Sequence, residues 1–216
     1  MSRAETPARY RQALHCGAEW DGQSVTRFRL WAPSVDQVQV QIDDEALLPM
    51  TPLAGGFYEA HVVCAPGSRY RFHLPDGTCV PDPCARFQNG DVRGHSVVVD
   101  PLAYVWQHAE WCGRPWHESV IYEMHVGVLG GFSAAQKCLA SIAQLGITVV
   151  ELMPIADFAG QRNWGYDGVL PFAPDESYGT PLELKAFIDT AHAQGMSVLL
   201  DVVYNHVGPV GNYLGQ

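Results

Sequence analysis

The 216-residue sequence lacks several features that assign proteins to particular classes. It contains no run of 18 consecutive apolar residues, so no segment predicts a transmembrane helix, and residues 1–20 lack the apolar stretch of a signal peptide. We therefore expect a cytoplasmic protein with no membrane partner. Basic residues are also scarce, since 13 lysines and arginines face 23 acidic residues for a formal net charge of −10. This charge repels a phosphate backbone and excludes nucleic acid as an expected partner.

Metal-binding and redox patterns are absent as well. The nine histidines include no HExxH motif, and the six cysteines form no CxxC pairs. These spacings predict no structural metal site, and no cofactor motif is present. For a cytoplasmic protein we expect the cysteines to be reduced and mostly buried. They are Cys16, Cys64, Cys79, Cys84, Cys112 and Cys138.

Between residues 25 and 100 the sequence contains several short runs in which apolar and polar residues alternate, and turn residues separate these runs. In VTRFRLW, Phe28 and Leu30 fall on one face of a strand, and Arg27 and Arg29 fall on the other. Similar runs occur at residues 38–42, 57–63, 68–74 and 96–100. Repeated short strands of this kind are typical of an antiparallel sandwich. We predict that residues 1–105 form an N-terminal immunoglobulin-like β-sandwich domain.

Residues 106–119 are predicted to connect this sandwich to a second domain. The segment contains Trp106, Trp111 and Trp116, which a free linker does not need. We interpret these tryptophans as packing between the two domains, with stacking against a ligand ring as the alternative.

The hydrophobic period changes after residue 119. Three mostly apolar runs, at residues 120–126, 147–154 and 196–204, alternate with two helical patterns. Uniformly apolar strands joined through helices predict a buried parallel sheet with right-handed crossovers. A doubly wound sheet and a (β/α)₈ barrel both begin in this way. In both, a site forms at the carboxyl ends of the strands.

Capping residues define the two predicted helices. Ser133 and Gln136 are spaced as a capping box at the start of the first helix. Thr180 is the expected N-cap of the second, with Pro181 at its first position and Glu183 at its third. The predicted buried stripes are Ala135, Cys138, Leu139, Ile142 and Leu145 in the first helix, and Leu184, Phe187, Ile188 and Ala191 in the second.

Polar and aromatic residues gather at the expected strand ends, where His125 ends the first strand. The long loop after the second strand contains Trp164 and Tyr166 between glycines, which suits either a ring-binding surface or a loop with buried aromatics. The third strand runs into DVVYNH, which places Asp201 and His206 at its end. The Asp, Asn and His of this motif (Asp201, Asn205 and His206) at the end of a buried strand favour a functional site.

Two glutamates interrupt the apolar strands. A carboxylate in a buried strand is costly unless it is paired. We therefore expect Glu123 and Glu151 to bond to neighbouring strands and not to act as an acid–base pair.

At these motifs the chain resembles the α-amylase family of glycoside hydrolases. DVVYNH (residues 201–206) is similar to the first signature of the family, and NWGYD (residues 163–167) to its sugar-stacking loop. RLWAPSVDQV, VPDPCARFQNGDVRGHSVVVDP and FAPDESYGTPLELKAFIDTAHAQGM resemble more closely its malto-oligosyltrehalose trehalohydrolase subgroup. Branching enzymes are the nearest alternative, but their stacking loop usually ends in Gln where this chain has Asp167.

The resemblance implies a fold and a set of binding residues. Residues 120–216 would contain the first three β-strands and two helices of an incomplete (β/α)₈ TIM barrel. The substrate would be maltooligosyl-trehalose or a related α-1,4-glucan, cleaved next to the trehalose unit. The substrate-binding residues would be Tyr166, His206, Asp167 and Trp164, with Asp201 and Asn205 supporting the site. Other family members use the residue that matches Asn205 to hold calcium, but nothing else in the sequence points to that ion.

The resemblance also places the catalytic carboxylates, the nucleophile and the acid, beyond Gln216. Glycoside hydrolysis generally requires two carboxyl groups. We therefore assign no catalytic residue and expect an amino-terminal fragment that is inactive alone. Two alternatives remain open: a non-enzymatic α-glucan-binding protein, and a remnant without function.

Overall fold

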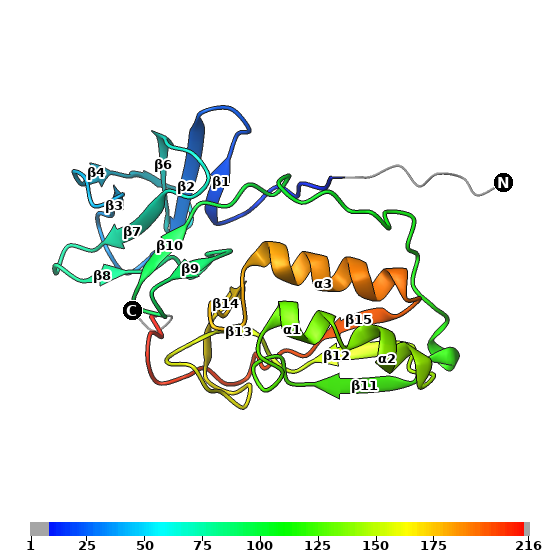
Figure 1. Cartoon of the computed structure of the whole chain (residues 1–216). Helices are drawn as coiled ribbons and strands as arrows, with labels where there is room; N and C mark the ends of the chain where they lie inside the picture. The colour runs from blue at the N-terminus through cyan, green and yellow to red at the C-terminus, as the bar shows by residue number, and fades with distance from the viewer. Residues whose placement is uncertain (1–8, 214–216) are drawn as a thin grey trace.

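The computed structural model describes residues 9–213, and its elements fall into two parts (Figure 1). Antiparallel sheets occupy the first hundred residues, and a parallel sheet with helices follows residue 119. Residues 1–8 of the predicted sandwich domain (1–105) and residues 214–216 of the predicted barrel part (120–216) lie outside the described residues. The fold is built mainly from β-strands. Within residues 9–213 no helix has the length and apolar character needed to cross a membrane.

The first part consists of two antiparallel sheets. One has the order β1-β2-β6-β5, and the other has the order β4-β3-β7-β10-β9 with β8 paired to β7. The strands of the first sheet are β1 (Gly17–Trp20), β2 (Val25–Trp31), β5 (Thr51–Leu53) and β6 (Phe57–Val63). Those of the second are β3 (Gln39–Ile42), β4 (Leu48–Pro49), β7 (Arg69–His73), β8 (Cys79–Val80), β9 (Gln88–Asn89) and β10 (His95–Val97).

Alternating side chains from both sheets form one core. Phe28 and Leu30 of β2 are buried, as the sequence pattern predicted, together with Tyr70 and Phe72 of β7. The rings of Phe28 and Tyr70 meet edge to face, with 4.8 Å between their centroids. The Tyr70 hydroxyl donates a 2.6 Å hydrogen bond to the buried carboxylate of Asp82. This bond ties β7 to the segment that follows β8.

The prediction that all six cysteines are reduced is wrong for one pair. Cys16 and Cys84 form a disulfide between the start of β1 and the segment after β8. Cys64, Cys79, Cys112 and Cys138 are free. The two bonded residues lie 68 positions apart, so no local spacing marks them, and only the folded sandwich brings them together.

The second part contains a three-stranded parallel sheet with the order β11-β12-β15. The strands are β11 (Ile121–Met124), β12 (Val149–Leu152) and β15 (Ser197–Leu200), which confirms the three predicted strands and their direction. Met124 and Leu152 pack against Phe132, Leu139 and Phe187 in a core shared with the helices. All three strands therefore end at the same edge of the sheet.

The helices are α1 (Phe132–Gln136), α2 (Leu139–Gln144) and α3 (Pro181–Ala193), and a 3₁₀ helix, η1 (Trp116–Glu118), precedes β11. The capping box of α3 is confirmed, because the Thr180 side chain accepts from the Glu183 backbone N–H while the Glu183 side chain accepts from Thr180. Pro181 occupies the first helical position.

The first helical segment differs from the prediction. It is divided between α1 and α2, and its N-cap is Gly131 with no side-chain cap, so the proposed capping box at Ser133 is wrong. The Ser133 hydroxyl instead donates a 2.7 Å hydrogen bond to Glu183 Oε1, which joins α1 to α3. Leu145 was predicted to be buried, but 79% of it is exposed because the helix ends just before it.

A β-hairpin occupies the segment predicted to be a long loop. Strand β13 (Ala156–Phe158) pairs antiparallel with β14 (Gly168–Pro174), with register shifts that mark irregular pairing. This irregularity and the prolines in the segment hide the hairpin from a search for alternating residues. The hairpin extends beyond the carboxyl end of β12.

The two strand glutamates do not bond to neighbouring strands as predicted. Glu123 and Glu151 lie side by side in register on adjacent strands. Within residues 9–213 neither side chain has a hydrogen-bond or ion-pair partner. The reason is their direction: Met124 and Leu152 face the helices, so the preceding residues face the opposite side of the sheet.

The connector is bound to α3 mainly through one carboxylate. Asp189 accepts hydrogen bonds from the Tyr104 hydroxyl, from the backbone N–H groups of Gln107 and His108, and from the His108 ring. Of the three connector tryptophans, Trp111 stacks on His192 of α3 at 5.0 Å, whereas Trp116 is 72% exposed. Trp111 therefore packs the connector against α3, whereas Trp116 is largely exposed to solvent.

Candidate functional site at the strand ends

A small cavity of about 60 Å³ lies at the carboxyl end of β15. The hairpin and the loop before β14 form one wall, and the chain after β15 forms the other. Its lining residues include Pro154, Gly165, Pro171, Asp201 and His206. Of the predicted site residues, Asp201 and His206 line this cavity, whereas Trp164, Tyr166, Asp167 and Asn205 are not among its lining residues.

Asn163 organises the loop that carries the aromatic residues. Its side chain is buried, and Oδ1 accepts hydrogen bonds from three consecutive backbone N–H groups, those of Gly165 (2.8 Å), Tyr166 (3.2 Å) and Asp167 (3.3 Å). This local arrangement is the side-chain turn that asparagine favours. The sequence analysis quoted Asn163 within NWGYD but assigned it no role. Its position directly before an aromatic–glycine pair is the signal that was available.

Gly165 fixes where this loop lies. Its φ of +102° is a conformation that favours glycine, and a Cβ atom there would lie 2.7 Å from Cδ of Pro154. The backbone therefore packs directly on the end of β12, and the flanking side chains turn outward. Trp164 is 83% exposed and Tyr166 is 57% exposed. The alternative in which these aromatics are buried under the loop is excluded.

His206 lies beside Tyr166. The two ring centroids are 6.3 Å apart, and the planes meet at 81° in an edge-to-face arrangement. The chain after His206 can pack closely against Asp167 because Gly208 has no side chain. A Cβ atom at Gly208 would lie 2.2 Å from the carbonyl oxygen of Asp167. Two motifs that are 40 residues apart in the sequence thus present an exposed aromatic face and an exposed imidazole side by side.

His125, at the end of β11, is engaged in holding the loop. Its Nε2 lies 2.6 Å from the backbone carbonyl oxygen of Asn163, and its Nδ1 accepts a hydrogen bond from the Val128 N–H. Nε2 is therefore the nitrogen that donates. With both nitrogens occupied, His125 positions the aromatic loop and does not offer a free group.

The remaining predicted site residues contribute less defined contacts. Asp201 lines the cavity and is half-buried, whereas Asp167 and Asn205 are exposed. None of these three side chains has a hydrogen-bond partner among residues 9–213. The supporting role of Asp201 and Asn205 stays a prediction. Over the described part of the chain, no group of three or more His, Cys, Asp or Glu residues is arranged to hold a metal ion.

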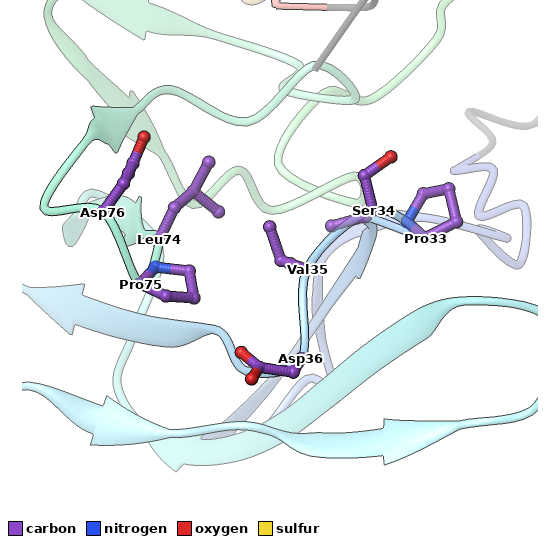
Figure 2. A pocket seen from close by; sticks show the side chains of 8 residues that line it. Pro33, Ser34, Val35, Asp36, Leu74, Pro75 and Asp76 are labelled. Carbon is purple, nitrogen blue, oxygen red and sulfur yellow. The ribbon is translucent and has the colours of Figure 1, made fainter.

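A larger hollow of about 650 Å³ lies on the sandwich, between residues 32–36 and 74–76 (Figure 2). Val35 and Leu74 lie across from each other in this hollow, and Asp36 and Asp76 supply its carboxylates. The described residues that line it include no aromatic side chain and no histidine. The strand-end site is therefore the better candidate for binding a ring.

Comparison with known proteins gives three consistent similarities. The sequence model of the alpha-amylase catalytic domain matches residues 84–214. A malto-oligosyltrehalose trehalohydrolase from Deinococcus radiodurans is 45% identical over 198 residues, which cover 90% of this chain and 33% of that protein. A crystal structure from Salmonella typhimurium, described as a candidate alpha amylase, is 47% identical with a TM-score of 0.91, covering 94% of this chain and 35% of that one.

A more distant structure carries a bound sugar. The type I pullulanase of Bacillus subtilis, complexed with maltose, is 26% identical with a TM-score of 0.78, covering 92% of this chain and 34% of that one. The chain described here thus spans about a third of the length of the curated relatives it matches.

Proposed function

Because the chain belongs to the alpha-amylase family, we propose that it is part of a glycoside hydrolase that releases trehalose from maltooligosyl-trehalose. The bond cleaved would be the α-1,4 bond next to the trehalose unit. The names of the curated relatives support this substrate over other α-glucans.

The proposal extends to the architecture. The two antiparallel sheets with their shared core are consistent with an immunoglobulin-like sandwich in residues 1–105, joined through residues 106–119 to residues 120–216. The parallel order β11-β12-β15, with helices between the strands, is consistent with the first part of a (β/α)₈ barrel.

The observation that supports a sugar site best is the pairing of Tyr166 with His206. An exposed aromatic face binds the C–H face of a glucose ring, and an adjacent imidazole can bond to a hydroxyl of the same ring. We propose these roles for Tyr166 and His206. Trp164 and Asp167 would contact neighbouring parts of the glucan, with Asp201 and Asn205 supporting the site.

Catalysis is a separate matter from binding. Hydrolysis of a glycosidic bond generally uses two carboxyl groups on either side of that bond. Among the described residues that line the strand-end cavity, Asp201 is the only carboxylate. We therefore propose that the 216-residue chain alone binds glucan but does not cleave it. Release of trehalose above the rate of a mock preparation would contradict this part.

Two other functions are distinguished by the same site. A branching enzyme would transfer a glucan segment, and its loop usually has Gln at the position of Asp167, so Asp167 favours the hydrolase. A non-enzymatic glucan-binding protein would need the same Tyr166 surface and would bind with no preference for the trehalose end.

The experiment is isothermal titration of maltotetraose and maltotriosyl-trehalose into the chain. We expect Tyr166→Ala to weaken binding by about tenfold or more, since an aromatic contact is worth about 1 kcal/mol beyond its buried area. Tyr166→Phe should bind nearly as wild type because the ring remains. Tyr10→Ala is the matched control, because Tyr10 is 59% exposed and remote in sequence from the site.

Equal binding by the Tyr166→Ala and Tyr10→Ala variants would refute the stacking role. Tighter binding of maltotriosyl-trehalose than of maltotetraose supports the trehalohydrolase. Equal affinity for both would favour a general glucan-binding protein.

A further inference from the structure

A third cavity, larger than the one at the strand ends, lies where the sandwich meets α3. Its volume is about 740 Å³, which is in the range of small-molecule sites. The segment before β1 and strand β1 form one side, and β14 and α3 form the other. Much of its wall is apolar, and three aromatic side chains contribute to it: Trp20, Trp106 and Phe172. Such walls suit the flat face of a ring.

Two cations line this cavity without an ion-pair partner. Arg86 and Lys185 are both half-buried, and neither lies within ion-pair distance of a carboxylate among residues 9–213. Arg86 Nη1 donates to the Cys84 carbonyl oxygen at 3.2 Å, and its guanidinium lies 4.7 Å from the centroid of the Phe172 ring. Lys185 Nζ has one long hydrogen bond, 3.4 Å, to the Pro101 carbonyl oxygen.

Leaving two cations in this state is unfavourable. Burial lowers the pKa of both Arg86 and Lys185, and the more distant carboxylates of Asp82 and Asp100 only oppose this effect. A partly desolvated cation is stabilised further when an opposite charge pairs with it. The cavity therefore has a place for an anion that the described residues do not fill.

The other charges around the cavity strengthen this conclusion. Arg11 also lines it, and the one carboxylate that residues 9–213 contribute to the lining, Glu19, is already paired with Arg11 and Arg27. This positive cavity belongs to a chain whose net charge is −10. Non-specific attraction of anions to the whole surface is thus disfavoured, and binding would have to be local.

We propose that this cavity binds a phosphomonoester carried on a ring, such as a sugar phosphate or a nucleoside monophosphate. The phosphate would lie between Arg86 and Lys185, since a guanidinium and an ammonium are the side chains that bind phosphate oxygens best. The ring would lie against Trp106 or Trp20. Neither cation belongs to the glucan site, so the proposal is independent of the function proposed above.

The test measures the melting temperature and the Kd of the full 216-residue chain with five probes: glucose 6-phosphate, AMP, glucose, adenosine and inorganic phosphate. We expect at least one of the two phosphomonoesters to raise the melting temperature and to bind at least tenfold more tightly than its neutral counterpart and than inorganic phosphate. Glucose 6-phosphate against AMP shows which ring the cavity prefers.

Two variants link binding to the cavity. Arg86→Gln and Lys185→Met should each weaken phosphomonoester binding by about tenfold or more, because each removes a charged donor. Lys137→Gln is the matched control, since Lys137 is exposed and is not among the residues that line the cavity. Lys185→Met retains the apolar stem and should fold even if Arg86→Gln does not, because Lys185 makes only one long hydrogen bond.

Three results would overturn the proposal. The first is unchanged binding in a folded Lys185→Met variant, and the second is equal binding of glucose or adenosine. The third is equal binding of inorganic phosphate, which would leave no role for a ring.

Discussion

Pro171 and Phe172 are neighbours in β14, yet they line different cavities. Pro171 borders the strand-end cavity beside Asp201 and His206, and Phe172 borders the cavity beneath Arg86. Successive side chains of a strand point to opposite faces, so one hairpin forms a wall of both cavities.

The first prediction concerns His206. Replacing it with alanine should weaken maltotetraose binding by about five- to tenfold, because one hydrogen bond to a sugar hydroxyl contributes about 1 kcal/mol. His206→Gln, which keeps a hydrogen-bonding group, should recover part of the loss. Titration calorimetry measures both, with the exposed His117 of η1 replaced by alanine as the control. Wild-type affinity in His206→Ala would remove this residue from the site.

The second prediction concerns Asn163. Asn163→Ala leaves three loop N–H groups without their acceptor, and we expect it to reduce the free energy of unfolding by about 1–3 kcal/mol. Asn163→Asp keeps the acceptor oxygen and should cost less. Urea denaturation gives the free energies, and limited proteolysis reports opening of the loop. Gln161→Ala, an exposed change in the same loop, should alter neither.

The third prediction is a pH dependence from Asp157. This carboxyl is fully buried, and burial, followed by the negative charges of Asp175, Asp91 and Glu176, raises its pKa from 3.8 to about 8, which the backbone N–H of Glu176 offsets only in part. A group with a raised pKa stabilises the folded state most below its unfolded pKa, and this stability is lost as the pH rises through the folded pKa. The fall should thus occur between about pH 4 and pH 8.

Asp157→Asn removes the titrating proton and should flatten this fall. Denaturant midpoints measured at several pH values provide the comparison, and the exposed Asp36→Asn serves as the control. At most about 1.4 kcal/mol per pH unit is expected from one group. An identical pH profile in wild type and Asp157→Asn would show that Asp157 is ionised in the folded protein.

The fourth prediction concerns Asp189. Burial alone would raise its pKa, but hydrogen bonds from Gln107, His108 and Tyr104 outweigh burial and lower it. Asp189→Ala should therefore destabilise the chain by about 1–3 kcal/mol, since it leaves several part-buried donors without an acceptor. The stability that Asp189 contributes should disappear as the pH falls below about 4, because protonation removes the charged acceptor. Thermal melts of Asp189→Ala and Asp189→Asn test this, and a change below 0.5 kcal/mol in both, on the order of a typical surface substitution, would contradict it.

The fifth prediction concerns the disulfide. Its two cysteines are 68 residues apart, and closing a loop of that length in the unfolded chain corresponds to about 4 kcal/mol. Reduction with dithiothreitol should lower the melting temperature, and the Cys16→Ser, Cys84→Ser double variant should match the reduced protein. The exposed free cysteine Cys112, changed to serine, is the control. A melting temperature that does not respond to dithiothreitol would indicate that the thiols are not joined in solution.

The sequence alone determined the periodic parts of this protein. Apolar and polar residues alternate along β2 with a period of two. This pattern predicted which face of the strand is buried, and Phe28 and Leu30 are indeed buried. The three apolar runs became β11, β12 and β15, and Thr180 caps α3, because these features depend on local spacing and on short-range hydrogen bonds. The polar residues after each strand could be placed at one edge of the sheet for the same reason.

Only the tertiary structure decided the features that depend on distant parts of the chain. The Cys16–Cys84 disulfide, the hairpin within the supposed loop and the contact between Tyr166 and His206 each join segments without a shared local pattern. The cavity that brings together Arg86 and Lys185, neither of which forms an ion pair within residues 9–213, likewise joins distant segments. Sequence spacing records which residues are neighbours along the chain, whereas burial and charge pairing depend on which residues become neighbours in space.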